Sequence, residues 1–480
     1  MTSVTTSPFD DDALHEECAV FGIFGHDEAA SMAALGLHSL QHRGQEATGM
    51  VTTNGAGLYQ KRGLGHVGEH FSAETGFQAE LPGHAAIGHN RYSTTGQSEY
   101  RNIQPFLTEL AFGPFGLAHN GNLTNAERLR HSLVDTGSLY QSTTDTETII
   151  HLVARAHAEE PVARLREALK QVQGAYALLA LTKDKLVGVR DPLGIRPLVL
   201  GKKQEAYVLA SETCALDIIG ADYVRDIDPG EMVVIDKDGL KSERLTQHKT
   251  SRFCIFEYIY FARPDSMLEG RSVYQARKAI GAELAKESAV EADLVIPVPD
   301  SGVPAALGFA EASNTSFELG IVRSHYIGRT FIQPSQDERI SSVKLKHSAN
   351  REIVKGKDIV LVDDSIVRGT TSRKIVSMMR DAGARKVHMR IASPPTNNPC
   401  FYGVDTPDKD KLIAAQMSLD EIAAEIGADS LAFISLDGLY RAMGETERNN
   451  DTPQFCDACF TGDYPVPTSS SQVRTGKEKS

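Results

Sequence analysis

The sequence contains no tryptophan and few cysteines, six among 480 residues. So few cysteines do not form the framework of a small disulfide-stapled secreted domain, and a chain of this length can bury a core without such bonds. The first 17 residues also lack the basic start and apolar segment of a secretory signal. We therefore expect a reducing cytoplasmic setting, in which cysteines that cluster are more often metal-binding or catalytic.

Long apolar runs and an excess of basic charge are missing as well. No stretch of about 18 apolar residues occurs, so we expect no transmembrane helix and no membrane partner. The formal net charge is −13, from 50 Lys and Arg against 63 Asp and Glu. A nucleic-acid-binding protein needs a basic surface for its phosphate contacts, so we expect no nucleic-acid partner. Local basic pockets for small phosphorylated molecules are not excluded by this balance.

The chain divides into regions of different pattern, and its length predicts about two or three domains. Residues 1–17 carry five acidic residues and no apolar period, which indicates a disordered leader. Residues 18–250 contain many short apolar strands, interrupted by helical stretches at 28–41 and around 145–170. This pattern predicts an α+β domain of stacked sheets and helices.

The pattern changes at about residue 251. Apolar strands then alternate with helical stretches such as 275–288, 303–312 and 371–382, which predicts a parallel sheet with helical crossovers in an α/β domain over 251–465. Residues 466–480 are rich in Ser, Lys and Thr and are predicted to be a disordered tail.

The segment DIVLVDDSIVRGTTS, residues 358–372, is the strongest motif in the chain. A buried strand ends in Asp363 and Asp364, and a loop of small residues then opens a helix. Backbone N–H groups and hydroxyls at a helix N-terminus suit a phosphate, while two acids at a strand end suit sugar hydroxyls or Mg²⁺. An acidic turn with an N-cap is the simpler alternative, but it does not explain why all three features occur together.

This motif closely resembles the phosphoribosylpyrophosphate (PRPP) motif of type I phosphoribosyltransferases. Residues 297–310, PVPDSGVPAALGFA, resemble that family's pyrophosphate loop, and residues 326–346 resemble its mobile catalytic loop. The resemblance implies PRPP binding by Asp300, Ser301, Gly302, Arg329, Lys344, Asp363, Asp364, Arg368, Gly369, Thr370, Thr371 and Ser372, with Mg²⁺ at Ser301, Asp363 and Asp364.

A second candidate site begins at Cys18, in the stretch HEECAVFGIFGH. A lone cysteine is more often a buried small hydrophobe than a nucleophile. However, QHRGQEATG, GHNRYSTTG, NIQPF, AHNGNL and TTDTE follow it in order, each with polar residues at a glycine-rich turn or strand end. Together these segments resemble the class II glutamine amidotransferase domain, a glutaminase of the N-terminal nucleophile hydrolase type with αββα layers.

The resemblance implies that the leader is a propeptide of residues 1–17 and that its removal makes Cys18 the first residue. A free α-amine has a pKa of about 7.7–8.0 and can accept the thiol proton, whereas an amide cannot. By the same resemblance, Cys18 is catalytic, with Asn120 and Gly121 forming the oxyanion hole. Arg91 and Asp145 are expected to hold the α-carboxylate and α-amine of glutamine, and Arg43 and Gly44 to shape its site.

The remaining cysteines form a third candidate site. Cys456 and Cys459 make a CxxC motif, and Cys254 and Cys400 are single. From the residues alone, tetrahedral Zn²⁺, a [4Fe–4S] cluster and unligated thiols all stay open. The resemblance extends to an iron–sulfur, propeptide-carrying subtype and implies one [4Fe–4S] cluster on these four residues. Cys214 has no matching role and is expected to pack in a core.

A glutaminase joined to a phosphoribosyltransferase implies a single reaction. Ammonia from glutamine would replace pyrophosphate at C1 of PRPP, giving 5-phosphoribosylamine and glutamate, the first committed step of purine nucleotide synthesis. The resemblance also implies feedback inhibition by purine nucleotides and a homotetramer. The alternatives are a PRPP-sensing regulator, a sugar-phosphate-aminating amidotransferase and a structural metalloprotein, and none of them needs both sets of motifs.

Overall fold

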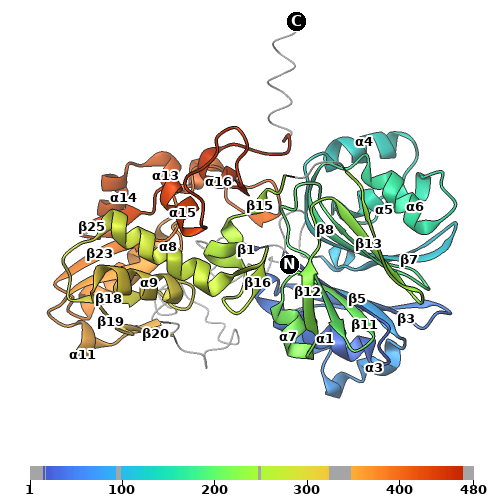
Figure 1. Ribbon diagram of the computed structural model, residues 1–480, viewed down its shortest axis with the longest axis horizontal. Coiled ribbons are helices and arrows are strands. Elements are labelled where there is room, and N and C mark those ends of the chain that lie inside the picture. The colour runs from blue at the N-terminus through green and yellow to red at the C-terminus, as the bar shows by residue number, and fades with distance from the viewer. Residues whose placement is uncertain (1–14, 17, 93–98, 247–249, 324–346, 469–480) are drawn as a thin grey trace, which may run out of the picture.

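The computed structural model describes residues 15–16, 18–92, 99–246, 250–323 and 347–468 of the chain. The N-terminal half lies at the right of Figure 1, in blue to green, and the C-terminal half at the left, in yellow to red. Within the described residues no helix is long and apolar enough to cross a membrane.

The N-terminal half contains two antiparallel sheets. Seven described strands form the first, in the order β12 (Asp222–Asp226), β10 (Val199–Lys203), β11 (Ala206–Ala210), β2 (Ala19–Phe24), β5 (Ala85–Arg91), β3 (Ala47–Thr53) and β4 (Leu58–Leu64). Six form the second, in the order β14 (Gly239–Arg244), β13 (Glu231–Asp236), β9 (Leu186–Arg190), β8 (Gly174–Leu181), β7 (Gly113–Leu123) and β6 (Phe106–Leu110).

These sheets pack face to face because both present apolar side chains to the space between them. Val20, Val51 and Ile87 of the first sheet meet Leu179 and Val233 of the second in one buried cluster. Helices α1 (Ala29–Ser39) and α7 (Cys214–Ile219) cover the outer face of the first sheet, and α4 (Ala126–Asp135), α5 (Thr146–Arg155) and α6 (Pro161–Leu169) lie over the second (Figure 1). The predicted αββα layering is confirmed.

The C-terminal half is built on a parallel sheet in the order β19 (Ser316–Phe317), β18 (Leu294–Pro297), β22 (Asp358–Asp363), β23 (Lys386–Ile391) and β25 (Ser430–Phe433). Its strands are buried on both faces and therefore read as continuous apolar runs. One face packs on α8 (Val273–Ser288) and α9 (Val303–Ser313), and the other on α12 (Thr370–Asp381) and α14 (Leu419–Ile426). The predicted α/β domain is confirmed.

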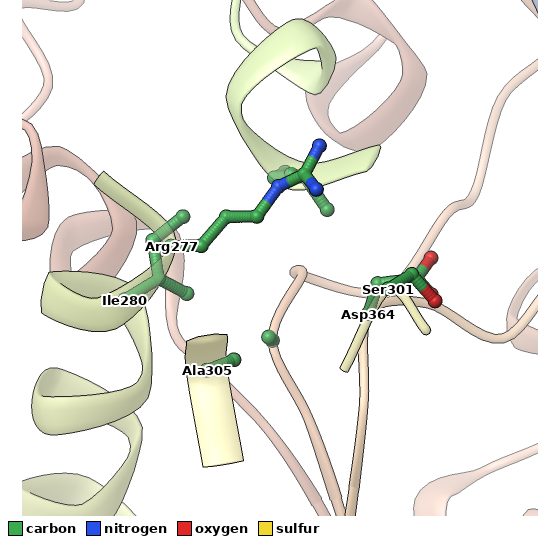
Figure 2. A pocket seen from close by; sticks show the side chains of 7 residues that line it. Arg277, Ile280, Ser301, Ala305 and Asp364 are labelled. Atoms are coloured by element: carbon green, nitrogen blue, oxygen red, sulfur yellow. The ribbon is translucent and has the colours of Figure 1, made fainter. Parts of the chain in front are cut away.

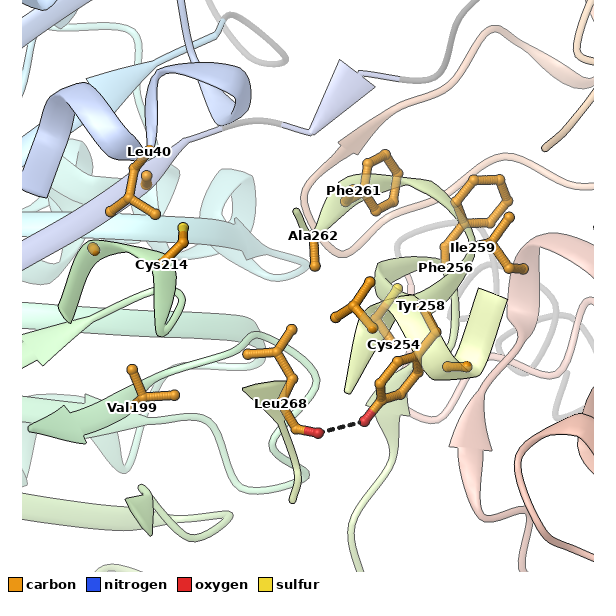
Figure 3. Close-up of a cluster of buried hydrophobic side chains, with 14 of the residues drawn as sticks. Leu40, Val199, Cys214, Cys254, Phe256, Tyr258, Ile259, Phe261, Ala262 and Leu268 are labelled. Carbon is orange, nitrogen blue, oxygen red and sulfur yellow. Dashed lines mark hydrogen bonds between the residues drawn. The ribbon is translucent and has the colours of Figure 1, made fainter. Parts of the chain in front are cut away.

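The segment that joins the halves is buried rather than an exposed linker. It begins with β15 (Phe253–Cys254) and a π-helix, η4 (Glu257–Phe261), whose aromatic side chains lie in a continuous apolar cluster (Figure 3). The Tyr258 hydroxyl donates to the Leu268 carbonyl oxygen at 2.8 Å. Because this cluster also includes Leu40, Val199 and Cys214, the two halves share part of one core. Cys214 packs there, as predicted.

Three details differ from the expectations drawn from the sequence. Residues His15–Glu16 of the leader form a strand, β1, paired antiparallel with β24 (Val404–Asp405). Val466 was expected to begin the disordered tail. Instead, its carbonyl oxygen accepts from the Tyr402 hydroxyl at 2.7 Å, and its nitrogen donates to the same hydroxyl at 2.9 Å. Strands β3 and β4 and helix α4 were not predicted. In each case long-range pairing or packing orders a segment whose local pattern is weak.

Candidate active sites

Cys18 immediately precedes β2, in the middle of the first sheet. Its side chain is buried, and its backbone nitrogen donates to the Arg43 carbonyl oxygen at 3.2 Å. Its Sγ lies 3.9 Å from the Tyr92 carbonyl oxygen, just past the end of β5. Cys18 has φ of 122°, a left-handed value that non-glycine residues rarely adopt. The thiol therefore sits where a turn, a strand end and a strained backbone meet.

Gly44 explains how the turn after α1 comes so close to Cys18. A Cβ at Gly44 would lie 2.8 Å from the Arg91 carbonyl carbon and 2.9 Å from the Arg91 nitrogen, so only glycine fits against this backbone. Arg91 ends β5, and its Nη1 donates to the Asn102 carbonyl oxygen at 3.3 Å. The structure thus brings Cys18, Gly44 and Arg91 together, although they are far apart in sequence.

Asn120 and Gly121 lie on β7, in the second sheet. Asn120 is fully buried, and among the described residues neither atom of its side-chain amide has a hydrogen-bond partner. A buried amide without a partner is costly and calls for an explanation such as a ligand. Gly121 has φ of 140°, and a Cβ there would lie 2.1 Å from the Ala175 carbonyl oxygen. This backbone conformation is open only to glycine, and it places the Gly121 N–H directly after the unpartnered Asn120 amide in the chain.

A hydrogen bond between the sheets brings β7 to the end of β5. His89 Nε2 lies 3.1 Å from the His119 carbonyl oxygen, and burial together with the Arg91 charge lowers the pKa of His89 to about 3. Asp145 precedes α5 and accepts from the Leu123 nitrogen at 2.9 Å. Burial acts to raise the pKa of Asp145, but the His119 side chain and this backbone bond outweigh it, so Asp145 is an anion. It can therefore pair with a substrate ammonium group.

Two features near this site were missed from the sequence. The Arg43 side chain points away from it into buried carboxylates, which are described below. Residues 401–403 of the C-terminal half lie against β7: Asn122 Nδ2 donates to the Phe401 carbonyl oxygen at 2.9 Å, and a Cβ at Gly403 would lie 2.9 Å from the Gly121 Cα. The one sequence feature that could have indicated this close approach of two backbones is the glycine at position 403, because it carries no side chain.

The second site lies at the carboxyl edge of the parallel sheet, where β18 and β22 end side by side. Ser301 Oγ donates to Asp364 Oδ1 at 2.5 Å, which joins the two predicted loops. Both Asp363 and Asp364 are buried, and a Cβ at Gly302 would lie 2.4 Å from the Val362 carbonyl oxygen. The predicted acids, hydroxyl and glycine therefore converge on one edge.

The remaining PRPP residues surround this edge. Gly369 is left-handed, with φ of 80°, and starts α12, whose first turn contains Thr370, Thr371 and Ser372; Arg368 precedes it. Asp300 is exposed and pairs with Arg323 of β20 (Ile321–Arg323). Arg329 and Lys344 lie outside the described residues. The described strands on either side of them, β20 and β21 (His347–Ala349), pair antiparallel.

A small pocket connects the second site with the joining segment (Figure 2). Its lining includes Ser301, Asp364, Arg277, Ala305 and Ile259. The Arg277 guanidinium is buried and donates to the Tyr258, Tyr260 and Ala262 carbonyl oxygens at 2.9, 2.7 and 2.6 Å. Burial lowers the pKa of Arg277, and the Asp364 charge opposes this effect. The arginine thus connects the joining segment with the edge that carries Ser301 and Asp364.

The four cysteines of the third candidate site come from three segments that pack together. Strands β15 and β26 (Phe455–Cys456) are parallel neighbours, with Cys254 opposite Cys456. Cys459 lies on α16 (Ala458–Thr461), and its carbonyl oxygen accepts from the Asn397 and Asn398 nitrogens, both at 3.0 Å, in the segment that leads to Cys400. Burial and the charges of Cys254 and Cys400 raise the pKa of both Cys456 and Cys459. The four thiols are therefore within electrostatic reach of one another.

Comparison with known proteins agrees with this division of the chain. A family model described as a glutamine amidotransferase domain matches residues 89–217, and one described as a phosphoribosyl transferase domain matches residues 268–419. An amidophosphoribosyltransferase of Rhizobium etli is 54% identical over 96% of this chain and 94% of its own length. One from Bacillus subtilis is 49% identical over 94% and 95%.

Solved structures are similarly close. The structure titled as the allosteric regulatory enzyme of purine biosynthesis has a TM-score of 0.90 at 49% identity, covering 94% of this chain and 96% of that one. The glutamine PRPP amidotransferase of B. subtilis, complexed with ADP and GMP, has a TM-score of 0.89 at 48% identity and covers 95% and 100%.

Proposed function

Because the chain belongs to the amidophosphoribosyltransferase family, we propose that Cys18 releases ammonia from glutamine and that the loops at Ser301 and Asp364 hold the PRPP that receives it. The chain is an enzyme of purine biosynthesis that uses glutamine and PRPP and forms 5-phosphoribosylamine, pyrophosphate and glutamate. The observation that carries the residue assignment is that Cys18 contacts the Tyr92 carbonyl oxygen just past Arg91, while the His89–His119 bond joins the strand of Arg91 to the strand of Asn120.

In the glutaminase reaction, the α-amine of a processed Cys18 takes the thiol proton and the thiolate attacks the glutamine amide carbon. The Asn120 Nδ2 and the Gly121 N–H donate to the oxyanion that forms. The α-amine then returns its proton to the leaving ammonia, and water hydrolyses the thioester to glutamate. Asp145, an anion in its buried position, binds the substrate ammonium, and Arg91 binds the carboxylate.

In the phosphoribosyl half, Asp363 and Asp364 receive the ribose hydroxyls, and the start of α12 receives the 5-phosphate. The residues fit Mg²⁺ at Ser301, Asp363 and Asp364, since the Ser301 hydroxyl and an Asp364 oxygen already lie 2.5 Å apart and are hard oxygen donors. Bound there, the metal would offset the pyrophosphate charge. Ammonia then attacks C1 of PRPP, and pyrophosphate leaves.

The donor chemistry of Cys254, Cys400, Cys456 and Cys459 fits one [4Fe–4S] cluster with a structural role. No group of three or more His, Cys, Asp or Glu in the described part of the chain is spaced to hold a single metal ion. Cluster thiolates each bind a different iron, whereas four zinc ligands meet at one ion with Zn–S distances of about 2.3 Å. The thiols raise one another's pKa values and so lie near one another, as either group requires; the proposal of a cluster over zinc rests on the resemblance of the four positions to the iron–sulfur subtype.

Regulation, assembly and location extend the proposal. A relative of known structure binds ADP and GMP, and nucleotide regulation of this chain is proposed on that basis. The homotetramer, the cytoplasmic location, the removal of residues 1–17 and the roles of Arg329 and Lys344 stay predictions.

The experiment that tests the function is pyrophosphate release from PRPP by the purified chain. Release is expected with glutamine or ammonium and Mg²⁺, and not with PRPP alone. Intact mass is expected to place the N-terminus of the active enzyme at Cys18. Iron and sulfide analysis after anaerobic purification is expected to give about four of each per chain. Stoichiometric zinc without iron would contradict the cluster but not the reaction.

A further inference from the structure

Behind the Cys18 site lies a group of buried charges that the reaction described above does not use. Arg43, Arg196, Glu212 and Glu257 all have side chains with no exposed surface, and three ion pairs join the two arginines to the two glutamates. Taking four charged groups out of water is costly, so buried ion pairs are weak evidence for stability alone. The position of this group beside a catalytic turn suggests another role.

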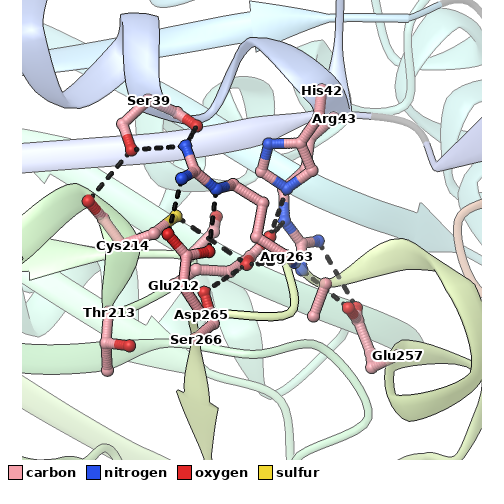
Figure 4. Close-up of polar contacts among 12 residues, drawn as sticks. Ser39, His42, Arg43, Glu212, Thr213, Cys214, Glu257, Arg263, Asp265 and Ser266 are labelled. Atoms are coloured by element: carbon pink, nitrogen blue, oxygen red, sulfur yellow. Dashed lines mark hydrogen bonds and ion pairs between the residues drawn. The ribbon is translucent and has the colours of Figure 1, made fainter. Parts of the chain in front are cut away.

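Arg43 is the centre of the group (Figure 4). Its Nε donates to Glu212, and its Nη2 donates to Glu257 Oε2 at 2.6 Å, with a longer bond from Nη1 to Glu257 Oε1 at 3.4 Å. His42 Nε2 lies 2.7 Å from Glu212 Oε1. The guanidinium therefore bridges two carboxylates from different parts of the chain, which fixes the turn that carries it.

Each carboxylate is itself held in place. Glu212 Oε2 accepts from the Ser266 hydroxyl at 2.6 Å and from the Arg263 nitrogen at 2.8 Å. Burial acts to raise the pKa of Glu212, but the charges of Arg43 and His42 outweigh it, so the pKa falls well below its usual range. Glu257 begins η4, in the segment that joins the halves, outside the residues matched by either family model.

The same turn makes the bond that matters for catalysis. The Arg43 carbonyl oxygen accepts from the Cys18 nitrogen at 3.2 Å, and this nitrogen becomes the α-amine once the leader is removed. When an amine donates one hydrogen to a carbonyl that is held in place, that bond fixes the rotation of the amine and so the direction of its lone pair. The neighbouring Ser211 holds the strand on the other side of Cys18: its Oγ accepts from the Val20 nitrogen at 3.0 Å.

We propose that Glu257 and Glu212 are positioning residues, which act through Arg43 to fix the carbonyl that orients the α-amine of Cys18 toward its own thiol. The proposal rests on the proposed function, because it requires Cys18 to be the nucleophile. It also gives Arg43 a more specific role than shaping the glutamine site: a positioning role changes kcat for glutamine, whereas a role in binding glutamine changes KM.

The test uses the full chain with Glu257→Gln, which removes one negative charge and keeps the side-chain shape. We expect kcat with glutamine to fall by about 10- to 100-fold, as for a small misplacement of a reacting group. KM for glutamine is expected to stay within about threefold, and activity with ammonium within about twofold. Glu257→Asp, which keeps the charge, is expected to recover part of the lost kcat.

Glu269→Gln is the matched control. Glu269 Oε1 pairs with the fully buried Arg190 at 2.7 Å and also lies in the joining region, but none of its described contacts reaches residues 41–44. We expect this variant to keep both activities. Intact mass confirms that residues 1–17 are removed in each variant, and alkylation by iodoacetamide reports the reactivity of Cys18 separately from that of the other cysteines.

Three results would overturn the proposal. One is an unchanged glutamine kcat in Glu257→Gln, and another is a rise in KM alone, which would make Arg43 a binding residue. The third is an equal loss of both activities, matched by Glu269→Gln, which would mean a general loss of structure. Failure of the proposed function is a different result: glutamine activity would then survive Cys18→Ala, whatever Glu257 does.

Discussion

The two halves of the molecule build their sites in different ways. The PRPP site is formed by two loops at one edge of a parallel sheet, and most of its residues are consecutive in sequence. The glutaminase site takes Cys18, Arg91, Asn120 and Asp145 from separate strands and a helix start in two stacked sheets. A parallel sheet gathers its loops at one edge by topology alone, whereas stacked antiparallel sheets need specific contacts, such as His89 with His119, to align their strands.

This difference predicts how separable the two chemistries are. Each site has its own reacting groups, so a change in one half removes its own reaction and leaves the other half folded. The joining segment is the exception, because its Glu257 pairs with Arg43 of the first half and its Tyr258 carbonyl accepts from Arg277, which lines the pocket beside Asp364.

Cys18→Ala is expected to have the largest effect. Without the covalent nucleophile, glutamine-dependent activity is expected to fall by about 10⁴- to 10⁶-fold. Activity with ammonium at alkaline pH is expected to remain, because free NH₃ attacks PRPP without a thiol. Rates of pyrophosphate release with each nitrogen donor measure both effects. A chain that starts with alanine at position 18 serves as the control for blocked processing, and equal loss of both activities would contradict separable sites.

Replacing Asp363 and Asp364 together by alanine is the reciprocal change. Pyrophosphate release is expected to fall by about 10³-fold with either nitrogen donor, since these acids are the proposed metal and ribose ligands. Glutamine hydrolysis measured without PRPP is expected to stay at the wild-type rate. Unchanged PRPP affinity by calorimetry would show that the motif is not the binding site.

Asn120→Ala tests the oxyanion hole. Loss of one such donor typically lowers kcat by about 10²- to 10³-fold, and the same loss is expected here with glutamine only. Asn122→Ala, on the same strand, is the matched control, because its amide donates to Phe401 rather than facing the site. Similar losses in both variants would point to a disturbed strand instead of a lost donor.

Glu147, at the start of α5 beside Asp145, gives a smaller effect that depends on pH. Burial acts to raise its pKa, but the His151 side chain 3.7 Å away and hydrogen bonds from Ser142 and the Gln141 nitrogen outweigh it and lower the value to about 2. The ionised Glu147 therefore stabilises the folded state fully above pH 4.5, the ordinary pKa of a glutamate. This stabilisation is lost as the pH falls from about 4.5 toward 2. Glu147→Gln is expected to cost about 1–3 kcal/mol of unfolding free energy at pH 7.

The same substitution is also expected to flatten the decline in stability below pH 5. Urea unfolding of both proteins between pH 7 and pH 3 measures the two effects together. Parallel curves for Glu147→Gln and the wild type would show that the carboxylate does not contribute in this way.

The sequence predicted the two fold classes and supplied the candidate site residues, for reasons that differ between the halves. Strand β22 with its paired acids is a local signal, so Asp363, Asp364 and the start of α12 could be assigned from one segment. Cys18 could be assigned only through several segments together. The structure brings these segments together in space, although no single segment is specific for a glutaminase.

Long-range contacts could not be predicted from local patterns. The pairing of Glu212 and Glu257 with Arg43 spans 169 and 214 residues of the chain. Likewise, nothing in the local sequence indicates that residues 404–405 pair with residues 15–16. Such contacts depend on how the two halves pack. The positions of buried charged residues in the sequence follow no periodicity or fixed spacing that would identify their partners.

The most direct test of two separate sites uses the unaltered enzyme and 6-diazo-5-oxo-L-norleucine, a glutamine analogue that alkylates a reactive thiol. We expect one adduct per chain, located on Cys18 by peptide mass spectrometry. Glutamine-dependent activity is expected to fall in proportion to labelling, while ammonium-dependent pyrophosphate release from PRPP remains. An adduct on another cysteine, or parallel loss of both activities as labelling proceeds, would contradict the account.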